Sequence, residues 1–173
     1  KDPHTLIFDK SGILWFTVQN ANRIGRLDPK TGDIKLLTPP TAKSRPYGMA
    51  FGADGSVYVS SLAINLNNCD SGVAVSRSTD GGATFADPVF AQQSTTCSVS
   101  DDKNWLVTDT QPNSPFFGRI YQFWSEFLPS GASPQVVRWS DDNGKHWSGT
   151  HFLASRKQFA QNSQAFVQPD GAI

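Results

Sequence analysis

The chain of 173 residues has few charged side chains and no excess of either sign. Charged residues make up 17 % of it, and 15 basic side chains balance 15 acidic ones. A nucleic-acid-binding surface or an anionic-membrane surface requires a basic patch, so this composition argues against nucleic acid as a partner. No apolar run approaches the roughly 18 residues that indicate a membrane span. Sustained helical periodicity is also missing, and the sequence therefore predicts neither a transmembrane segment nor a mainly helical fold.

Metal-binding residue types are also scarce. The chain contains three histidines and two cysteines, and no Cys-x-x-Cys pair. His146 lies inside a Gly-containing turn motif, so no metal-ligand spacing emerges. The sequence therefore predicts no metal site and no identifiable cofactor, although oxygen-rich loops would suit a calcium or magnesium ion.

Two octapeptides share one pattern. Ser78–Phe85 and Ser140–Trp147 both read Ser-x-Asp-x-Gly-x-x-aromatic, and each follows an apolar run. The pattern predicts a tight turn in which a carboxylate caps backbone N–H groups and a glycine takes the φ > 0 position. The residues expected to build these two turns are Ser78, Asp80, Gly82, Phe85, Ser140, Asp142, Gly144 and Trp147.

The octapeptides resemble the Asp-box of BNR-repeat proteins, the sialidase-like β-propellers, and the resemblance covers about residues 49–173. It implies that both turns are structural and lie on blade edges, away from the ligand face. Residues 1–48, with Pro3-His4-Thr5 and Arg45-Pro46-Tyr47-Gly48, resemble instead a blade of the streptogramin (virginiamycin B) lyase-like propellers. A natural mosaic, a recombined chain or one lineage with unlike blades would each produce this pattern.

A second repeat runs through the whole chain. Similar clusters recur around Gly12, Gly55, Gly118 and Gly171, at spacings of 43, 63 and 53 residues. Short β-rich segments that repeat at such periods are typical of propeller blades. We therefore expect an all-β propeller of four-stranded antiparallel blades, with a fourth blade that begins with a strand at Ser163–Val167. The predicted blades are residues 3–46, 47–100 and 101–161, and a partial blade at 162–173.

Three blades and the start of a fourth are too few for a ring, because known propellers have about four to eight. We therefore expect that further chain or other subunits close the ring. The two cysteines fall in loops that open on one face of such a propeller, Cys69 between strands two and three of blade 2 and Cys97 before blade 3. A bridge between them predicts a secreted or periplasmic protein; the alternative is two free thiols.

Ligand contacts are expected where the loops at the start of each innermost strand converge. These loops are polar and rich in amides, which suits a carbohydrate or another small extracellular ligand, although ordinary solvated loops would have the same composition. Asp102 and Lys103 form the strongest polar pair. The candidates on this face are His4, Arg45, Tyr47, Asp70, Asp102 and Lys103.

The resemblances imply two functions, and fold alone cannot choose between them. One is glycan binding, as the platform of a sialidase-like glycoside hydrolase; the other is a metal-dependent lyase that acts on a cyclic ester. The sialidase family's Phe-Arg-Ile-Pro start and the lyase family's His/Glu cluster have no match in this chain. The catalytic residues therefore stay unknown, and a non-catalytic interaction propeller is a third option.

Overall fold

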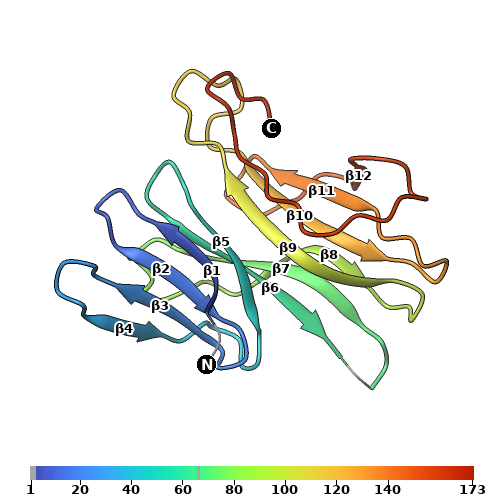
Figure 1. The fold of residues 1–173 in the computed structure, drawn as a ribbon, viewed down its shortest axis with the longest axis horizontal. Coiled ribbons are helices and arrows are strands. Elements are labelled where there is room, and N and C mark those ends of the chain that lie inside the picture. Colours follow the sequence, from blue (N-terminus) through green and yellow to red (C-terminus); the bar gives the residue numbers. More distant parts are fainter. Residues whose placement is uncertain (1–2, 66) are drawn as a thin grey trace.

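The computed structural model describes residues 3–65 and 67–173. In this part the chain forms twelve strands and no helix, and accordingly no helix that could cross a membrane. The strands make three separate four-stranded antiparallel sheets, which stand side by side like the blades of a fan (Figure 1).

Each sheet takes its four strands in sequence order, so neighbouring strands are also consecutive in the chain. Blade 1 contains β1 (Pro3–Phe8), β2 (Leu14–Val18), β3 (Arg23–Leu27) and β4 (Ile34–Leu37). Blade 2 contains β5 (Pro46–Phe51), β6 (Val57–Ile64), β7 (Ser71–Ser78) and β8 (Val89–Ser94). Blade 3 contains β9 (Ser100–Thr108), β10 (Ile120–Phe127), β11 (Gln135–Ser140) and β12 (His151–Phe152).

The first strands of the three blades are the innermost ones. β5 packs against both β1 and β9, and β8 and β12 lie at the far edges of their sheets. This arrangement confirms the predicted all-β propeller of four-stranded blades, and the sheets do not close into a ring (Figure 1).

The hydrophobic core lies between the blades. Trp15 and Ile24 of blade 1 pack against Met49, Val57 and Val59 of blade 2 in one buried cluster. A second cluster joins Ala50, Tyr58 and Val75 of blade 2 to Leu106 and Ile120 of blade 3. Alternate residues of each strand thus face opposite neighbours, as the period of two in a β-strand requires.

The predicted strand at Ser163–Val167 is wrong, because the described residues include no ladder partner for it. This segment lies against the outer face of blade 3 instead, where Ala165 and Val167 pack near Tyr121 and Phe123. The Trp105 indole N–H donates to the Ala165 carbonyl at 3.2 Å. A strand is defined by its ladder hydrogen bonds, and side-chain packing of this kind does not supply them.

The two octapeptides form turns with matching hydrogen bonds, one between β7 and β8 and the other between β11 and β12. Ser78 Oγ accepts from Gly82 N at 2.9 Å and donates to Asp80 Oδ1 at 2.8 Å. Ser140 repeats both bonds with the Gly144 N–H and the Asp142 carboxylate at the same distances. The same local sequence therefore produces the same turn twice.

Each turn is tied together by its carboxylate and by its final aromatic ring. Thr84 donates to the Asp80 carboxylate from its hydroxyl at 2.6 Å and from its N–H at 2.9 Å, and these bonds lower the Asp80 pKa to about 2. Phe85 packs against the core between blades 1 and 2, and Trp147 against that between blades 2 and 3. The turns thus anchor the outer strands to the inter-blade core.

Candidate central cavity

Each innermost strand has an irregularity near its start. The register with the second strand shifts between Pro3 and Leu6 in β1, and between Pro46 and Met49 in β5. In blade 3 the register between β9 and β10 shifts between Phe123 and Ser125, opposite Trp124. A β-bulge turns side chains out of the regular alternation and is common next to binding sites. The three bulges therefore direct side chains toward the place where the innermost strands meet.

One backbone hydrogen bond recurs after the first strand of each blade and again near residue 170, and it shows which residues of the repeats correspond. This bond joins Asp9 N to Ile13 O, Gly52 N to Ser56 O, Asp109 N to Arg119 O and Gln168 N to Ala172 O. Five residues before the donor of each bond stand His4, Tyr47, Asn104 and Ser163. These four residues line a single cavity of about 300 Å³, together with Thr5, Lys103, Trp105, Asn162 and Gln164.

His4 and Tyr47 are in contact across the boundary between blades 1 and 2. Their ring centroids are 3.9 Å apart, with the planes inclined by 50°. The two blades are further joined by Thr17, whose hydroxyl accepts from Thr5 N at 3.1 Å and donates to the Tyr47 carbonyl at 2.9 Å. Burial, helped by the charge of Asp102, raises the Tyr47 pKa to about 12, so the phenol keeps its proton.

Asp102 and Lys103 lie at the bulge of β9 and are half-buried. Lys103 Nζ is 3.5 Å from Asp102 Oδ2, and Lys103 N donates to Asp102 Oδ1 at 2.7 Å. The Lys103 backbone has a φ of 58°, which is uncommon for a residue other than glycine. Lys103 lines the cavity, and its charge is partly balanced by the neighbouring carboxylate.

Sequence reasoning missed Asn104 and Ser163. Asn104 is fully buried; its amide donates to Ser60 Oγ, and its Oδ1 has no hydrogen-bond partner within residues 3–65 and 67–173. Ser163 donates to Gln135 Oε1. The signal that identifies both residues is their constant distance from the turn, which His4 and Tyr47 share.

The structure leaves two of the predicted candidates outside this cavity. Arg45 is exposed, with a φ of 50°, just before the buried Pro46. Asp70 accepts from the Asn68 side chain at 2.7 Å and lines a separate hollow with Ile64 and Phe90. Only His4, Tyr47 and Lys103 of the six candidates line the central cavity, and Asp102 supports it from behind Lys103.

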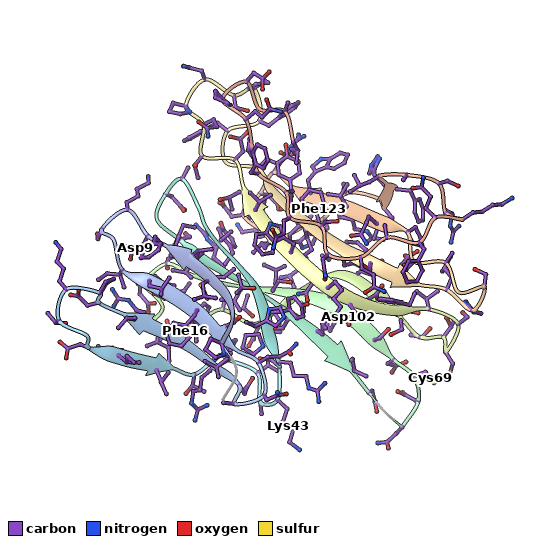
Figure 2. The ribbon with its side chains drawn as sticks, in the orientation of Figure 1. Asp9, Phe16, Lys43, Cys69, Asp102 and Phe123 are labelled. Carbon is purple, nitrogen blue, oxygen red and sulfur yellow. A yellow bond between two sulfur atoms is a disulfide. The ribbon has the colours of Figure 1, made fainter. Side chains whose placement is uncertain are left out.

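Cys69 and Cys97 form a disulfide, as predicted, with their Cα atoms 5.0 Å apart. The bridge joins the loop between β6 and β7 to the connection between β8 and β9. Figure 2 shows Cys69 at the outer end of blade 2, whereas Asp102 lies on β9 nearer the centre. The disulfide therefore fixes the approach to β9 and is not part of the cavity wall.

A buried pair of acids lies on β9 and β10. Asp101 faces Glu126 directly across the β9–β10 ladder, and both residues are buried. Burial, and then the Glu126 charge, raise the Asp101 pKa to about 6. The described residues contain no cluster of three or more His, Cys, Asp or Glu side chains that could hold a metal ion.

No protein-family model matches the chain, and no curated protein matches it. Among solved structures, it resembles the Penicillium chrysogenum α-L-arabinanase complexed with arabinobiose at 12% identity and a TM-score of 0.66, covering 91% of this chain and 50% of that one. The GH93 α-L-arabinofuranosidase of Fusarium graminearum, also with arabinobiose, matches at 15% identity and a TM-score of 0.63, with 90% and 49% covered. A Hadza microbial sialidase matches at 14% identity and a TM-score of 0.54, with 84% and 36% covered.

These likenesses establish the β-propeller fold independently of the sequence repeats. The chain spans about half the length of the α-L-arabinanase and the α-L-arabinofuranosidase that it resembles. At such low identity the shared property is the arrangement of blades, and activity does not transfer with it.

Proposed function

We propose that this chain is part of a secreted β-propeller that binds a neutral glycan in the central cavity. The observation that carries the proposal is the convergence of His4, Tyr47, Asn104 and Ser163, which occupy one repeated position in the three blades and in the segment that follows blade 3. Repetition of a polar position around the axis builds a site from several strands at once, as ligand pockets of modular folds commonly are.

The chemistry of the wall favours a neutral ligand rich in hydroxyl groups. Imidazole, phenol, hydroxyl and amide groups both donate and accept hydrogen bonds, and sugar hydroxyls need both. The single ammonium, Lys103, stands beside Asp102, so the wall has no strong net charge with which to attract an anion. Two fold neighbours bind arabinobiose, a neutral sugar, which supports the same ligand class here.

Two further observations support the proposals of secretion and of the wider function. A disulfide persists in an oxidising compartment, which supports an extracellular or periplasmic location. The two fold neighbours that hold arabinobiose, an arabinanase and an arabinofuranosidase, are about twice as long as this chain. We therefore propose that the cavity is a sugar-binding part of a glycoside hydrolase whose catalytic residues lie outside these blades.

The outer face of blade 1 supports a further blade as a partner. Phe8 ends β1 as Phe51 ends β5, and Leu6 and Met49 each lie two residues earlier in their strands. Met49 is buried against blade 1, yet Leu6 is 55% and Phe8 64% exposed. Because this face matches one that a neighbouring blade covers, we propose that another propeller blade covers it, in the same polypeptide or in another subunit.

Titration with arabinobiose, followed by the backbone amide resonances of Lys103 and Asn104, tests the glycan proposal. We expect both resonances to shift, and Lys103→Met to weaken the binding about tenfold because a hydrogen-bond donor to the sugar is lost. Lys157→Met removes an exposed lysine outside the cavity and serves as the matched control. Unchanged binding by Lys103→Met, or resonances that do not respond, would overturn the proposal.

A further inference from the structure

A long loop on the opposite side of blade 3 forms one wall of a second cavity. Three residues separate the ends of the hydrogen bond after the first strand in blade 1, between Asp9 and Ile13. Nine residues separate them in blade 3, between Asp109 and Arg119. The insertion is therefore confined to the turn between β9 and β10, next to the second octapeptide.

This loop is held by its own hydrogen bonds. The Asp109 carboxylate accepts from Gln111 N at 3.0 Å and from the Ser114 hydroxyl. Ser114 Oγ in turn accepts from Phe116 N at 3.0 Å, and Gly171 lies so close that a methyl group on it would overlap the Ser114 hydroxyl. The loop nevertheless leaves Phe116 40% and Phe117 55% exposed. A fixed loop that presents apolar rings to solvent is a preorganised contact surface.

Phe117 borders a cavity of about 470 Å³ between blades 2 and 3, on the side of the octapeptide turns. Its other principal walls are polar or aromatic. They are Asp54, Tyr58, Arg119, Asp141 and Asn143.

The corresponding turn is packed more closely between blades 1 and 2. There, a methyl group on Gly82 of the first octapeptide would lie 2.9 Å from the Trp15 ring. In the second octapeptide, the nearest atom to such a methyl on Gly144 is 3.9 Å away and belongs to Trp147 of the same turn. Tyr58 replaces Trp15 at this position of the repeat, so the smaller ring and the longer loop together open the space.

The charges around the cavity are paired. Arg119 donates to both oxygens of Asp141, at 2.7 and 3.1 Å, and Arg77 donates to Asp54 at 2.6 Å. A carboxylate offers about four acceptor positions, and the described contacts use two of those on Asp141. The wall therefore keeps free acceptors without a net charge, which suits neutral hydroxyl donors better than an anion or a cation.

Asn143 supplies the complementary donor. It has a φ of 64°, where the first octapeptide has Gly81 at 69°. Its Oδ1 accepts from the Tyr58 hydroxyl at 3.2 Å, which fixes the side chain and leaves the amide NH₂ as a donor at the cavity wall.

From these contacts we infer that the cavity between Phe117 and Asn143 is a second binding site for a neutral sugar residue. The exposed Phe117 ring packs against the C–H face of the sugar, and Asp141 and Asn143 bond its hydroxyls. This site lies on the side of the octapeptide turns and shares no lining residue with the central cavity. This inference is therefore independent of the proposed function.

The test is titration of the chain with arabinobiose, cellobiose and lactose, each to about 10 mM because single-residue sugar sites bind weakly. The readouts are the Gly118 backbone amide and the Asn143 side-chain amide. At least one sugar should shift both resonances, and Phe117→Ala should weaken that response about tenfold through lost apolar contact. Asp141→Asn, which keeps the shape of the side chain, should weaken it as well.

Phe159→Ala is the matched control, since Phe159 is also exposed and lines neither cavity. It should bind as the parent chain does, and Lys103→Met should leave the Gly118 and Asn143 responses intact. The inference is overturned if none of the three sugars shifts these resonances, or if Phe117→Ala responds as strongly as the parent. Loss of the response in Lys103→Met would also overturn it, because the response would then belong to the central cavity.

Discussion

Replacing Asp101 by asparagine should stabilise the protein at neutral pH. The Asp101 side chain is 2% exposed and faces Glu126 across the ladder, where like charges are destabilising. Neither Asp101 carboxylate oxygen has a hydrogen-bond partner in the described part of the chain. The nearby Trp124 and Arg138 offset part of this cost, but burial and Glu126 prevail and raise the Asp101 pKa to about 6. Asparagine has nearly the same shape and never ionises.

The magnitude follows from the shift in pKa. A rise from 3.8 to about 6 corresponds to roughly 3 kcal/mol, at 1.36 kcal/mol per pKa unit. Because the folded-state pKa is raised, the native protein binds a proton that the unfolded chain has lost between these two values. The cost of ionised Asp101 is thus absent below about pH 4, grows as the pH rises, and is complete above about pH 6.

Urea unfolding followed by tryptophan fluorescence, at pH 4, 6 and 8, measures the effect. The Asp101→Asn variant should differ little from the parent at about pH 4 and be more stable by up to roughly 3 kcal/mol at about pH 8. Asp170→Asn, at an exposed aspartate, should change the unfolding free energy by less than about 0.5 kcal/mol at each pH. A gain that is equal at all three values, or a loss at pH 8, would refute this account of the buried pair.

Three further changes test other parts of the structure. Replacing Cys69 and Cys97 by serine should lower the unfolding free energy by about 3–4 kcal/mol, because the bridge closes a 28-residue separation; unchanged urea midpoints would contradict this. Hydrogen bonds lower the pKa of both Asp80 and Asp142, so their stabilisation is present above about pH 4 and lost as the pH falls toward 2. In an acid titration, the unfolding free energy of Asp80→Ala should therefore fall less between about pH 4 and pH 2 than that of the parent chain. Finally, Phe8→Lys should reduce concentration-dependent self-association in sedimentation, since Phe8 is 64% exposed on the outer face of blade 1.

The strands could be predicted because their signals are local. The repeat predicts four-stranded antiparallel blades, and the structure has three such sheets with their strands in sequence order. The turns between strands contain glycines at positive φ, such as Gly12 and Gly55, at a constant place in each repeat. The disulfide could also be anticipated, because blade topology decides which loops share a face.

The content of the two cavities could not be predicted in the same way. Sequence reasoning looked for polar residues in loops, whereas Asn104 lies within β9 and is fully buried. The second cavity is lined by Tyr58, which is smaller than the Trp15 at the corresponding position of blade 1. Such a difference in volume between neighbouring blades is invisible until the repeats are superimposed in three dimensions.

Asp101 and Asp102 show how strand register gives two adjacent aspartates different surroundings. The two residues are adjacent and chemically identical, and a strand sends neighbouring side chains to opposite faces. Asp101 is therefore buried against Glu126 with a raised pKa, whereas Asp102 is half-exposed beside Lys103 at the cavity. The bulge that follows them lies opposite Trp124, and Lys103 within it lines the central cavity. A register shift of one residue would exchange the two aspartates, so the register fixes which carboxylate lies beside Lys103 near the central cavity and which one is buried and lowers the stability as the pH rises.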